Sequence, residues 1–424
     1  MSLTTSDVIL QRMMTLHPKI IDLTLDRMWR LLALLDHPEQ NLPPIVHIAG
    51  TNGKGSTHAM IRAGLESTGA SVHCYTSPHL AQFNERIRVA GRLITEGDLA
   101  EALDRCMEAN GPESITFFEI TTCAAFVAFT ETPADWLVLE VGLGGRLDAT
   151  NVVSQPALTV ITPVDMDHQA FLGNTVDKIA YEKAGIIKQG VPCIVAPQHD
   201  AAMEVIERQA ARMGAPVYAH GQHWHVGVEA GRLIYQDERG LLDLPLPNLI
   251  GPHQIINAGT SIAALRALGQ DDVACEAAVT RAEWPARMQR LTKGPLVRMA
   301  PGIELWLDGG HNPHAGRAIA ETLRALPPRP THLICGMLNT KDIAGFLRPF
   351  KDVVESLTAV SIPDERNTIP AEETAAHATS EGLPATTAPS VAEAVAAIAA
   401  RALRARVLIC GSLYLAGHVL RENG

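Results

Sequence analysis

Short apolar runs alternate with amphipathic stretches through the first half of the chain. The runs have the length of buried strands and comprise Ile45–Ala49, Val72–Tyr75, Trp136–Val141, Leu158–Thr162 and Cys193–Ala196. Between them, Ser56–Ser67 and Glu96–Glu108 have the spacing of helices. Such alternation predicts an α/β fold with a mostly parallel sheet and helices on both faces. Val217–Leu244 is richer in Gly and His, and its apolar residues alternate, which predicts short antiparallel strands or a hairpin.

The same rhythm restarts near Leu291–Pro295 and predicts a second, smaller α/β unit of Rossmann type. Strands are expected at Ile303–Leu307, His332–Cys335, Leu357–Val360 and Val407–Cys410, with helices at Gly316–Ala325 and Val391–Arg404. A single core rarely exceeds about 250–300 residues, so a chain of 424 residues should form two domains. We expect a first domain over 1–290, a linker over 291–295 and a second domain over 296–424.

Composition narrows the class of protein. Hydrophobic residues make up 46% and aromatic residues only 4%, so the core must consist mainly of aliphatic side chains. The net charge of −11 argues against a broad nucleic-acid-binding surface. Seven scattered cysteines without a C-x-x-C pair favour a reducing compartment. No signal peptide and no apolar run near the roughly 20 residues of a membrane span is visible. We therefore expect a cytoplasmic protein without nucleic-acid or membrane partners.

Residues 46–56 join an apolar strand to a glycine-rich turn and a helix start. Backbone N–H groups in such a turn can surround a polyphosphate, and Lys54 can neutralise its charge. The segment departs from the standard G-x-x-x-x-G-K-[ST] loop, because Ile48 replaces the first glycine and Gly55 follows Lys54. The alternative is an ordinary glycine turn. The predicted phosphate-binding residues are Gly53, Lys54, Gly55 and Ser56.

Glu140 lies at the end of the strand Trp136–Val141. A buried carboxylate is costly unless it is paired or metal-bound, and ligands of α/β sheets gather at the carboxyl ends of the strands. Glu140 is therefore a candidate ligand of a hard cation beside the phosphates. The alternative is a residue that caps a nearby helix.

The string Gly50–Ser56 resembles the phosphate loop of the Mur-ligase superfamily. The block Ser77–Ile87 (S-P-H-L-x-x-F-N-E-R-I) resembles its folylpolyglutamate synthase/dihydrofolate synthase branch. Matching blocks continue to Gly417 and so cover both expected domains. The resemblance implies a phosphate-loop ATPase domain followed by a Rossmann-like glutamate-ligase domain. It also implies an ADP-forming ligase that adds L-glutamate to dihydropteroate, to the γ-carboxylate of folates, or to both, through an acyl phosphate.

The resemblance further implies magnesium at two sites and allows a monovalent cation. It assigns Ser77, Glu140 and His168 to one Mg²⁺, although histidine is an unusual ligand for this ion. It also suggests that Lys183 is carbamylated, which would make it an anionic ligand of the second Mg²⁺. Carbamylation requires a neutral amine, which burial can supply. Without the resemblance, His168 would be interpreted as a polar residue whose hydrogen bonds are satisfied, and Lys183 as a solvated charge on a helix.

The same resemblance implies a pteroate pocket and a nucleotide site. The pteroate pocket would be lined by Thr116, Phe117, Phe118, Glu119, Leu147, Asp148 and Ala149, and its aromatic rings could sandwich a flat pterin. Two Phe at the start of an apolar helix are otherwise core residues. Asn257, Arg287 and Asp308 would contact ATP, His311 would lie near the incoming amino acid, and Ser412 would bind the glutamate carboxylate. Simple alternatives are a surface Arg287, a solvated His311 and a turn serine at Ser412. The family pattern is broken at Ala286, Gly310 and Thr340.

Two other functions remain compatible with parts of the sequence. One is the same ligase chemistry on a non-folate substrate, as in peptidoglycan-type Mur ligases or poly-amino-acid synthetases. The other is a phosphate-loop switch or transport ATPase, which would have no use for the His311 motif in a second domain. We expect a monomer that binds ATP, L-glutamate and a pteroate or folate. The sequence leaves open whether one or both ligase activities are present.

Overall fold

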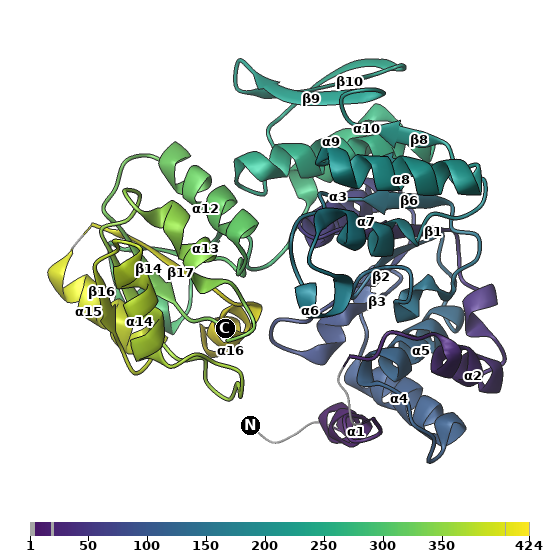
Figure 1. The fold of residues 1–424 in the computed structure, drawn as a ribbon, viewed down its shortest axis with the longest axis horizontal. Helices are drawn as coiled ribbons and strands as arrows, with labels where there is room; N and C mark the ends of the chain where they lie inside the picture. The colour runs from purple at the N-terminus through teal and green to yellow at the C-terminus, as the bar shows by residue number, and fades with distance from the viewer. Residues whose placement is uncertain (1–4, 18–20, 403, 424) are drawn as a thin grey trace. The chain divides into compact units, whose positions relative to one another are not determined.

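The computed structural model describes residues 5–17, 21–402 and 404–423. The chain forms two compact units (Figure 1). The larger comprises Met1–His79, Phe83–Asn248 and Ile255–Ala282, and the smaller comprises Leu80–Gln82, Leu249–Gln254 and Glu283–Gly424. No described helix is long and apolar enough to cross a membrane. All seven cysteines are free and buried.

The larger unit is built on an eight-stranded sheet in the order β4-β3-β2-β5-β1-β6-β7-β8. Six neighbouring strands are parallel, and β3 and β4 extend one edge in antiparallel pairing, which confirms the predicted α/β class. The strands are β1 (Ile45–Ala49), β2 (Val72–Tyr75), β3 (Ile87–Val89), β4 (Arg92–Leu93), β5 (Trp136–Glu140), β6 (Leu158–Ile161), β7 (Cys193–Val195) and β8 (Val217–Ala219).

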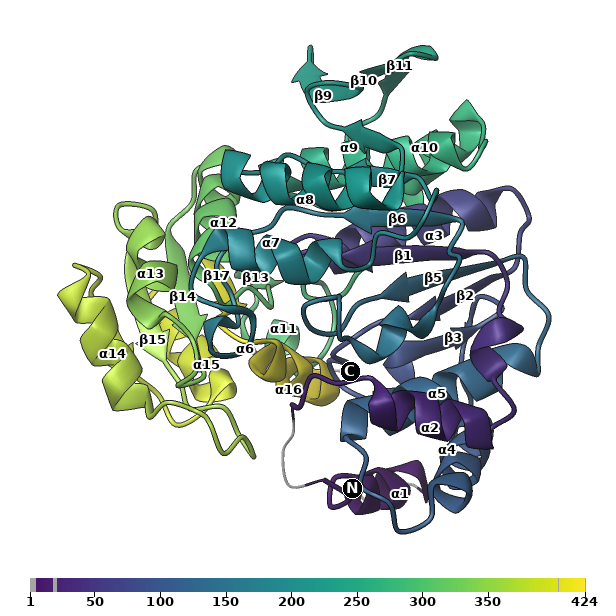
Figure 2. The ribbon, with the colours of Figure 1, turned by 45° about the vertical axis from the view of Figure 1, so that its right-hand side comes forward.

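Helices cover both faces of this sheet, as Figure 2 shows. On one face, helices including α5, α7 and α8 pack their apolar residues against the central strands. On the other face, Gly64 of α3 lies against Leu265 of α9 and Ala274 of α10. The main helices are α1 (Thr5–Met13), α2 (Asp26–Leu34), α3 (Lys54–Ser67), α4 (Glu96–Asn110), α5 (Phe117–Thr130), α6 (Gln169–Leu172), α7 (Val176–Ala184), α8 (Asp200–Met213), α9 (Pro252–Ala267) and α10 (Asp272–Arg281).

The segment predicted to be antiparallel contains β8 and a separate three-stranded sheet. Strands β9 (Trp224–Glu229), β10 (Arg232–Asp237) and β11 (Gly240–Leu244) pair as two consecutive hairpins. Trp224 and Val226 lie against Gly259 of α9, where a Cβ would lie 2.6 Å from Val226 Cγ1 and 2.8 Å from Trp224 Cζ3. The hairpins are thereby attached to the helix layer.

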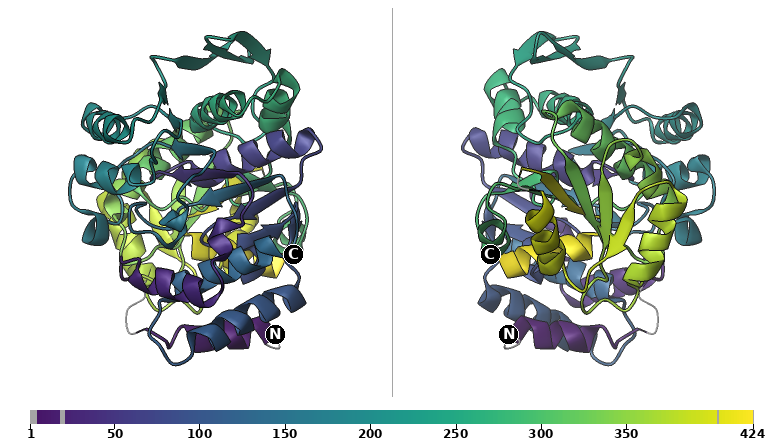
Figure 3. Two further views of the ribbon diagram at one scale, coloured as in Figure 1. Left: turned by 90° about the vertical axis from the view of Figure 1, so that its right-hand side faces the viewer. Right: turned by 90° about the vertical axis from the view of Figure 1, so that its left-hand side faces the viewer.

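The smaller unit contains a six-stranded sheet in the order β12-β13-β17-β14-β15-β16, seen in the right panel of Figure 3. All its strands are parallel except β12, which pairs antiparallel with β13. The strands are β12 (Gln289–Leu291), β13 (Glu304–Leu307), β14 (Thr331–Cys335), β15 (Ser356–Ala359), β16 (Ala385–Thr387) and β17 (Arg406–Cys410). Its helices are α11 (Pro295–Met299), α12 (Pro313–Ala325), α13 (Ile343–Leu347), α14 (Ala371–Ser380), α15 (Val391–Arg401) and α16 (Leu413–Asn423).

The division between the units falls after Ala282, eight residues before the boundary that the sequence suggested. The reason is β12, which belongs to the second sheet through its pairing with β13. The expected linker at 291–295 contains the last residue of β12 and the first residue of α11.

Candidate active site

The predicted motifs of the larger unit follow four neighbouring parallel strands. The strands β2, β5, β1 and β6 lie side by side in that order. Ser77 follows β2, Glu140 ends β5, the phosphate loop follows β1, and His168 lies beyond β6. Because parallel strands end at the same edge, these segments share the edge at which α/β proteins bind ligands.

The phosphate loop has the backbone geometry of an anion site. Gly50 has φ +152° and Gly53 has φ +87°, and α3 begins at Lys54. The first N–H groups of a helix have no acceptor within the helix, so they suit an anion. A Cβ at Gly53 would lie 2.4 Å from Oδ1 of Asn257. The structure therefore brings Asn257, on α9, against the loop as predicted, and it leaves no room there for any side chain at position 53.

Two lysines converge on one carbonyl of this loop. The Nζ atom of Lys54 donates to the Gly50 carbonyl at 3.0 Å, and that of Lys183, on α7, donates to the same oxygen at 2.9 Å. Lys183 is only 5% exposed, which excludes a solvated helix charge. Its burial, and secondarily the charge of Lys54, lowers the pKa of Lys183 to about 7. A large share of this amine is therefore neutral at physiological pH.

The predicted metal ligands differ in their surroundings. Glu140 is 4% exposed and is paired in register with Ile48 of β1. Ser77 is partly buried, whereas the His168 side chain is 42% exposed and lies 3.9 Å from Asp167. Within the described ranges, no three His, Cys, Asp or Glu side chains are grouped so as to hold a metal ion. The hydroxyl of Ser77 and the buried carboxylate of Glu140 are nevertheless the oxygen donors that Mg²⁺ prefers.

The predicted pteroate residues divide into a capped helix start and an aromatic cluster. Thr116 and Glu119 form a capping box at the start of α5. Both oxygens of Glu119 also accept from Arg27, at 2.9 and 3.1 Å, so this carboxylate stabilises the local structure. Phe117 lies edge-on to Phe83, at 5.9 Å between ring centroids.

The second aromatic residue and the loop after β5 form the rest of this region. Phe118 lies against Gly142, where a Cβ would be 2.4 Å from its ring. Leu147 is partly buried, and Ala149 is buried. Asp148 is buried and accepts hydrogen bonds from Leu143 N, Thr150 N and Thr150 Oγ1. Burial raises the pKa of Asp148 although these hydrogen bonds lower it.

In the smaller unit, predicted residues follow two neighbouring strands, β13 and β17. Asp308, directly after β13, accepts from Met288 N at 2.8 Å and from Gly310 N at 2.7 Å. Burial raises the pKa of Asp308, and the charge of Arg287 opposes that shift. His311 Nδ1 lies 2.8 Å from the Gly309 carbonyl, which can only accept, so Nδ1 carries the proton.

Ser412 lies after β17, at the start of α16. It is buried, and its Oγ accepts from Tyr414 N at 3.1 Å. The serine therefore caps the start of α16, as the turn alternative anticipated. Its assignment to glutamate binding remains a prediction.

Two residues that stabilise this edge of the sheet, Arg27 and Asp167, could not be recognised as important from the sequence. Arg27 was not identified, because it lies 92 positions from its partner Glu119 and belongs to no motif. Asp167, next to His168, partly opposes the lowering of the Lys183 pKa. Asp167 directly precedes the predicted His168 in the sequence, but its effect on Lys183 is recognisable only once the structure shows that α7 lies close to it.

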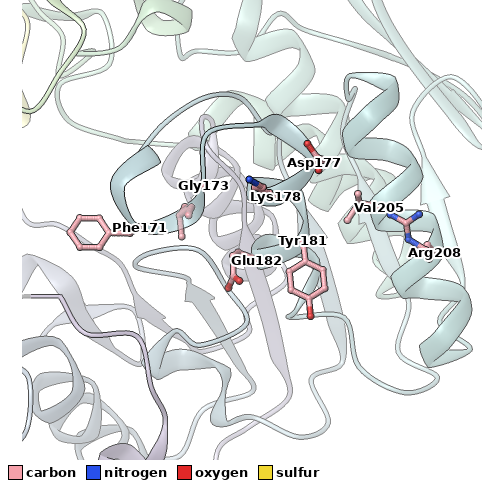
Figure 4. Close-up of a pocket in the computed structure, with 9 residues that line it drawn as sticks. Phe171, Gly173, Asp177, Lys178, Tyr181, Glu182, Val205 and Arg208 are labelled. Carbon is pink, nitrogen blue, oxygen red and sulfur yellow. The ribbon is translucent and has the colours of Figure 1, made fainter.

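A separate shallow pocket of about 480 Å³ lies along α6, α7 and α8 (Figure 4). Its lining includes Phe171, Lys178, Tyr181 and Arg208, and none of its lining residues belongs to the predicted site. On α7, Lys178 and Tyr181 are exposed, whereas Lys183 is buried. The pocket is therefore outside the phosphate-loop edge.

Comparisons with known proteins agree with this architecture. Residues 48–265 match the Mur ligase middle domain, and residues 286–413 match the Mur ligase glutamate ligase domain. The chain is 35% identical to the dihydrofolate synthase/folylpolyglutamate synthase of Escherichia coli, over 96% of this chain and 92% of that protein. The enzyme of the same name from Bacillus subtilis is 38% identical, over 71% and 72% of the two chains. The chain belongs to the dihydrofolate synthase/folylpolyglutamate synthase family of Mur ligases.

Solved structures of this folate-ligase family have the same fold. Escherichia coli FolC in complex with DHPP and ADP superimposes with a TM-score of 0.89 at 33% identity, covering 99% of this chain and 98% of that one. The Yersinia pestis enzyme complexed with AMPPNP and a Mn ion superimposes with a TM-score of 0.87 at 30% identity, covering 99% of each chain. The predicted family is confirmed. The match to a glutamate ligase domain argues against the alternative of a phosphate-loop switch or transport ATPase.

Proposed function

We propose that this protein is an ADP-forming ligase that joins L-glutamate both to dihydropteroate and to the γ-carboxylate of reduced folates. The observation that carries the proposal is the convergence of Lys54 and buried Lys183 on the Gly50 carbonyl, at the edge shared by the Ser77, Glu140 and His168 segments. This arrangement suits a polyphosphate at a cationic loop. Family membership supports the proposed identities of the two substrates, namely a pteroate or folate as the acid and L-glutamate as the amino acid.

The reaction needs no protein nucleophile. The substrate carboxylate attacks the γ-phosphorus of ATP, which forms an acyl phosphate and releases ADP. The α-amino group of glutamate then attacks the acyl carbon, phosphate leaves with the C–O bond electrons, and the amine loses its proton. Positioning and charge stabilisation supply the catalysis in such transfers.

Residues of the larger unit would hold the nucleotide and the acid. Backbone N–H groups of Gly53, Gly55 and Ser56 would bind phosphate oxygens, Lys54 would neutralise transferring charge, and Asn257 would fix the nucleotide against Gly53. The aromatic cluster at Phe117 and Phe118 would line the pteroate pocket, with Leu147, Asp148 and Ala149 on its loop. Thr116 and Glu119 would act there by holding the start of α5.

Residues of the smaller unit would contribute further contacts to the nucleotide and the amino acid. Arg287 and Asp308 would contact ATP, His311 would lie near the glutamate amine, and Ser412 would bind the glutamate carboxylate. We assign the phosphate loop and the pteroate pocket to the first domain, and the glutamate function together with further ATP contacts to the second.

Magnesium would neutralise polyphosphate charge at two sites. Ser77, Glu140 and His168 would hold one ion, and Lys183, as a carbamate, would hold the other. The low Lys183 pKa favours this modification, because only the neutral amine adds CO₂. The proposed set also includes a monovalent cation. The dependence of ADP release on K⁺ concentration would test this. We also infer a cytoplasmic monomer, which sedimentation would test.

One assay tests the proposal. ADP release would be measured with dihydropteroate or tetrahydrofolate, each with and without L-glutamate. We expect glutamate-dependent ADP release with both acids. Release with only one acid would overturn the bifunctional assignment, and release with neither would overturn the ligase assignment.

A further inference from the structure

The loop at residues 142–151, hereafter the β5 loop, holds the C-terminal turn of α7. Arg146 N donates to the Glu182 carbonyl at 2.7 Å. The guanidinium of Arg146 also donates to Glu182 Oε1, from Nε at 3.2 Å and from Nη2 at 2.9 Å. The Asn151 amide donates to the Gly185 carbonyl at 3.1 Å and to the Arg146 carbonyl at 3.0 Å. Asn151 thus bridges the loop and the residue that directly follows α7.

Two glycines allow the loop and the helix to approach this closely. A Cβ at Gly145 would lie 2.7 Å from the Glu182 carbonyl oxygen and 3.1 Å from the Lys183 Cα. A Cβ at Gly185 would lie 2.3 Å from the Arg146 Cβ. The backbone of the loop therefore lies directly against the segment that carries Lys183, and small shifts of one must move the other.

The β5 loop is also attached to the strand that leads into the phosphate loop. Thr150 Oγ1 donates to Asp148 at 2.6 Å and lies 2.9 Å from Nε2 of His47, on β1. Burial lowers the pKa of His47 to about 3, so its ring is neutral and can donate from Nε2 to the threonine oxygen. Lys183 in turn donates to the Gly50 carbonyl, directly after β1. Hydrogen bonds therefore link the β5 loop, α7 and the phosphate loop to one another.

We propose that Asn151 and Arg146 are positioning residues for Lys183, so that the β5 loop fixes this lysine on the phosphate loop. The inference rests on the proposed function, which gives Lys183 its role in the reaction. It goes further by linking the loop that carries Leu147, Asp148 and Ala149 to the phosphate site. A shift of this loop on binding the acid substrate would thereby be transmitted to Lys183.

A double-mutant cycle tests whether Asn151 acts through Lys183. We expect Asn151→Ala, which deletes two hydrogen bonds, to lower kcat for ADP release about ten-fold with a smaller change in KM for ATP. In the Lys183→Ala background the same change should alter kcat less than about two-fold, because the residue it positions is already absent. Equal losses in both backgrounds would show a merely structural role and overturn the proposal.

A second measurement does not depend on activity, and it tests the proposal even if Asn151→Ala folds poorly. Arg146→Ala removes a side chain that is 41% exposed, so the fold should tolerate it. Hydrogen exchange at residues 183–187 should accelerate several-fold in this variant. Arg105→Ala, which removes another exposed Arg–Glu pair of the same unit, is the matched control and should change neither exchange there nor turnover.

The outcomes separate the two proposals. Unchanged exchange at residues 183–187 in Arg146→Ala would overturn the positioning role while wild-type ligation persists. Wild-type turnover of Lys183→Ala would overturn the role of Lys183 and, with it, the positioning proposal. Absence of ligation by the wild-type protein would overturn the proposed function, and the exchange experiment would still report whether the β5 loop holds α7.

Discussion

Replacement of Lys183 by methionine should make the ligand-free protein more stable and strongly lower its turnover. Methionine has a similar volume and carries no charge, so Lys183→Met removes the free-energy cost of burying an amine. The fall of the Lys183 pKa from 10.5 to about 7 corresponds to about 5 kcal/mol against the buried charged form, at about 1.4 kcal/mol per pH unit. The hydrogen bond to the Gly50 carbonyl, worth about 1 kcal/mol, is lost in the variant.

The sign of the effect follows from proton binding. Between pH 7 and 10.5 the unfolded Lys183 is mostly protonated and the folded Lys183 is mostly neutral, so wild-type stability rises with pH through this window. At pH 8 the shifted pKa of Lys183 still lowers the unfolding free energy of the wild type by about 3 kcal/mol. After subtraction of the lost hydrogen bond, Lys183→Met should be more stable than the wild type by about 2 kcal/mol. Near pH 10.5 the advantage should vanish.

Urea unfolding of both proteins in CO₂-free buffer at pH 8 and pH 10.5 would measure this difference. Exclusion of CO₂ keeps the wild-type lysine as an amine, and comparison at each pH cancels the titration of all other groups. Parallel ADP-release assays should show turnover at least about 100-fold below the wild type for Lys183→Met. A variant less stable than the wild type at pH 8, or a difference independent of pH, would refute the reasoning.

Three further predictions concern the phosphate loop and the start of α5. Lys54→Ala should lower turnover by about 10²–10³-fold with an unchanged melting temperature, and normal turnover of the folded variant would contradict the nucleotide assignment. Gly53→Ala should weaken binding of a non-hydrolysable ATP analogue at least about ten-fold, because its Cβ would collide with Asn257. Gly69→Ala is its control, with φ +85° against +87° but no atom within 4 Å of the new Cβ, and equal affinities of the two variants would disprove the clash argument. Glu119→Gln should cost about 2 kcal/mol of unfolding free energy, because it removes the charge that pairs with partly buried Arg27, and an unchanged urea midpoint would rule this out.

Most secondary structure could be predicted from local pattern. The strand at Ile45–Ala49 was located to the residue, because four of its five residues are apolar and all five are buried. The helix after it begins at Lys54 rather than Ser56, since glycine at position 55 hid the first turn. Strands β3, β4, β12 and β16 were missed, because strands of two or three residues carry too little periodicity unless they lie in a longer apolar run.

The site could be predicted only in part. Motifs singled out Lys54, Glu140 and Asn257. The strand order explains why the segments of Lys54 and Glu140 meet at one edge, whereas Asn257 reaches the phosphate loop from α9. Strand order depends on crossover connections, which apolar periodicity does not encode. The burial of Lys183 was likewise invisible, because its helix has the pattern of a surface element and its partner, Gly50, lies 133 positions earlier. The pairing of Arg27 with Glu119 required the tertiary structure for the same reason.

Because all seven cysteines are buried, thiol-directed labels should react poorly with the native protein. Burial raises the pKa of Cys74, Cys106 and Cys193 to about 12, so the reactive thiolate is scarce at neutral pH. Cysteines introduced at exposed Glu207, on α8, and Glu372, on α14, would therefore be the positions that a maleimide dye pair labels. One dye would then lie on each compact unit with the native core left intact. Energy transfer between the two dyes would report any change in the distance between the units during turnover.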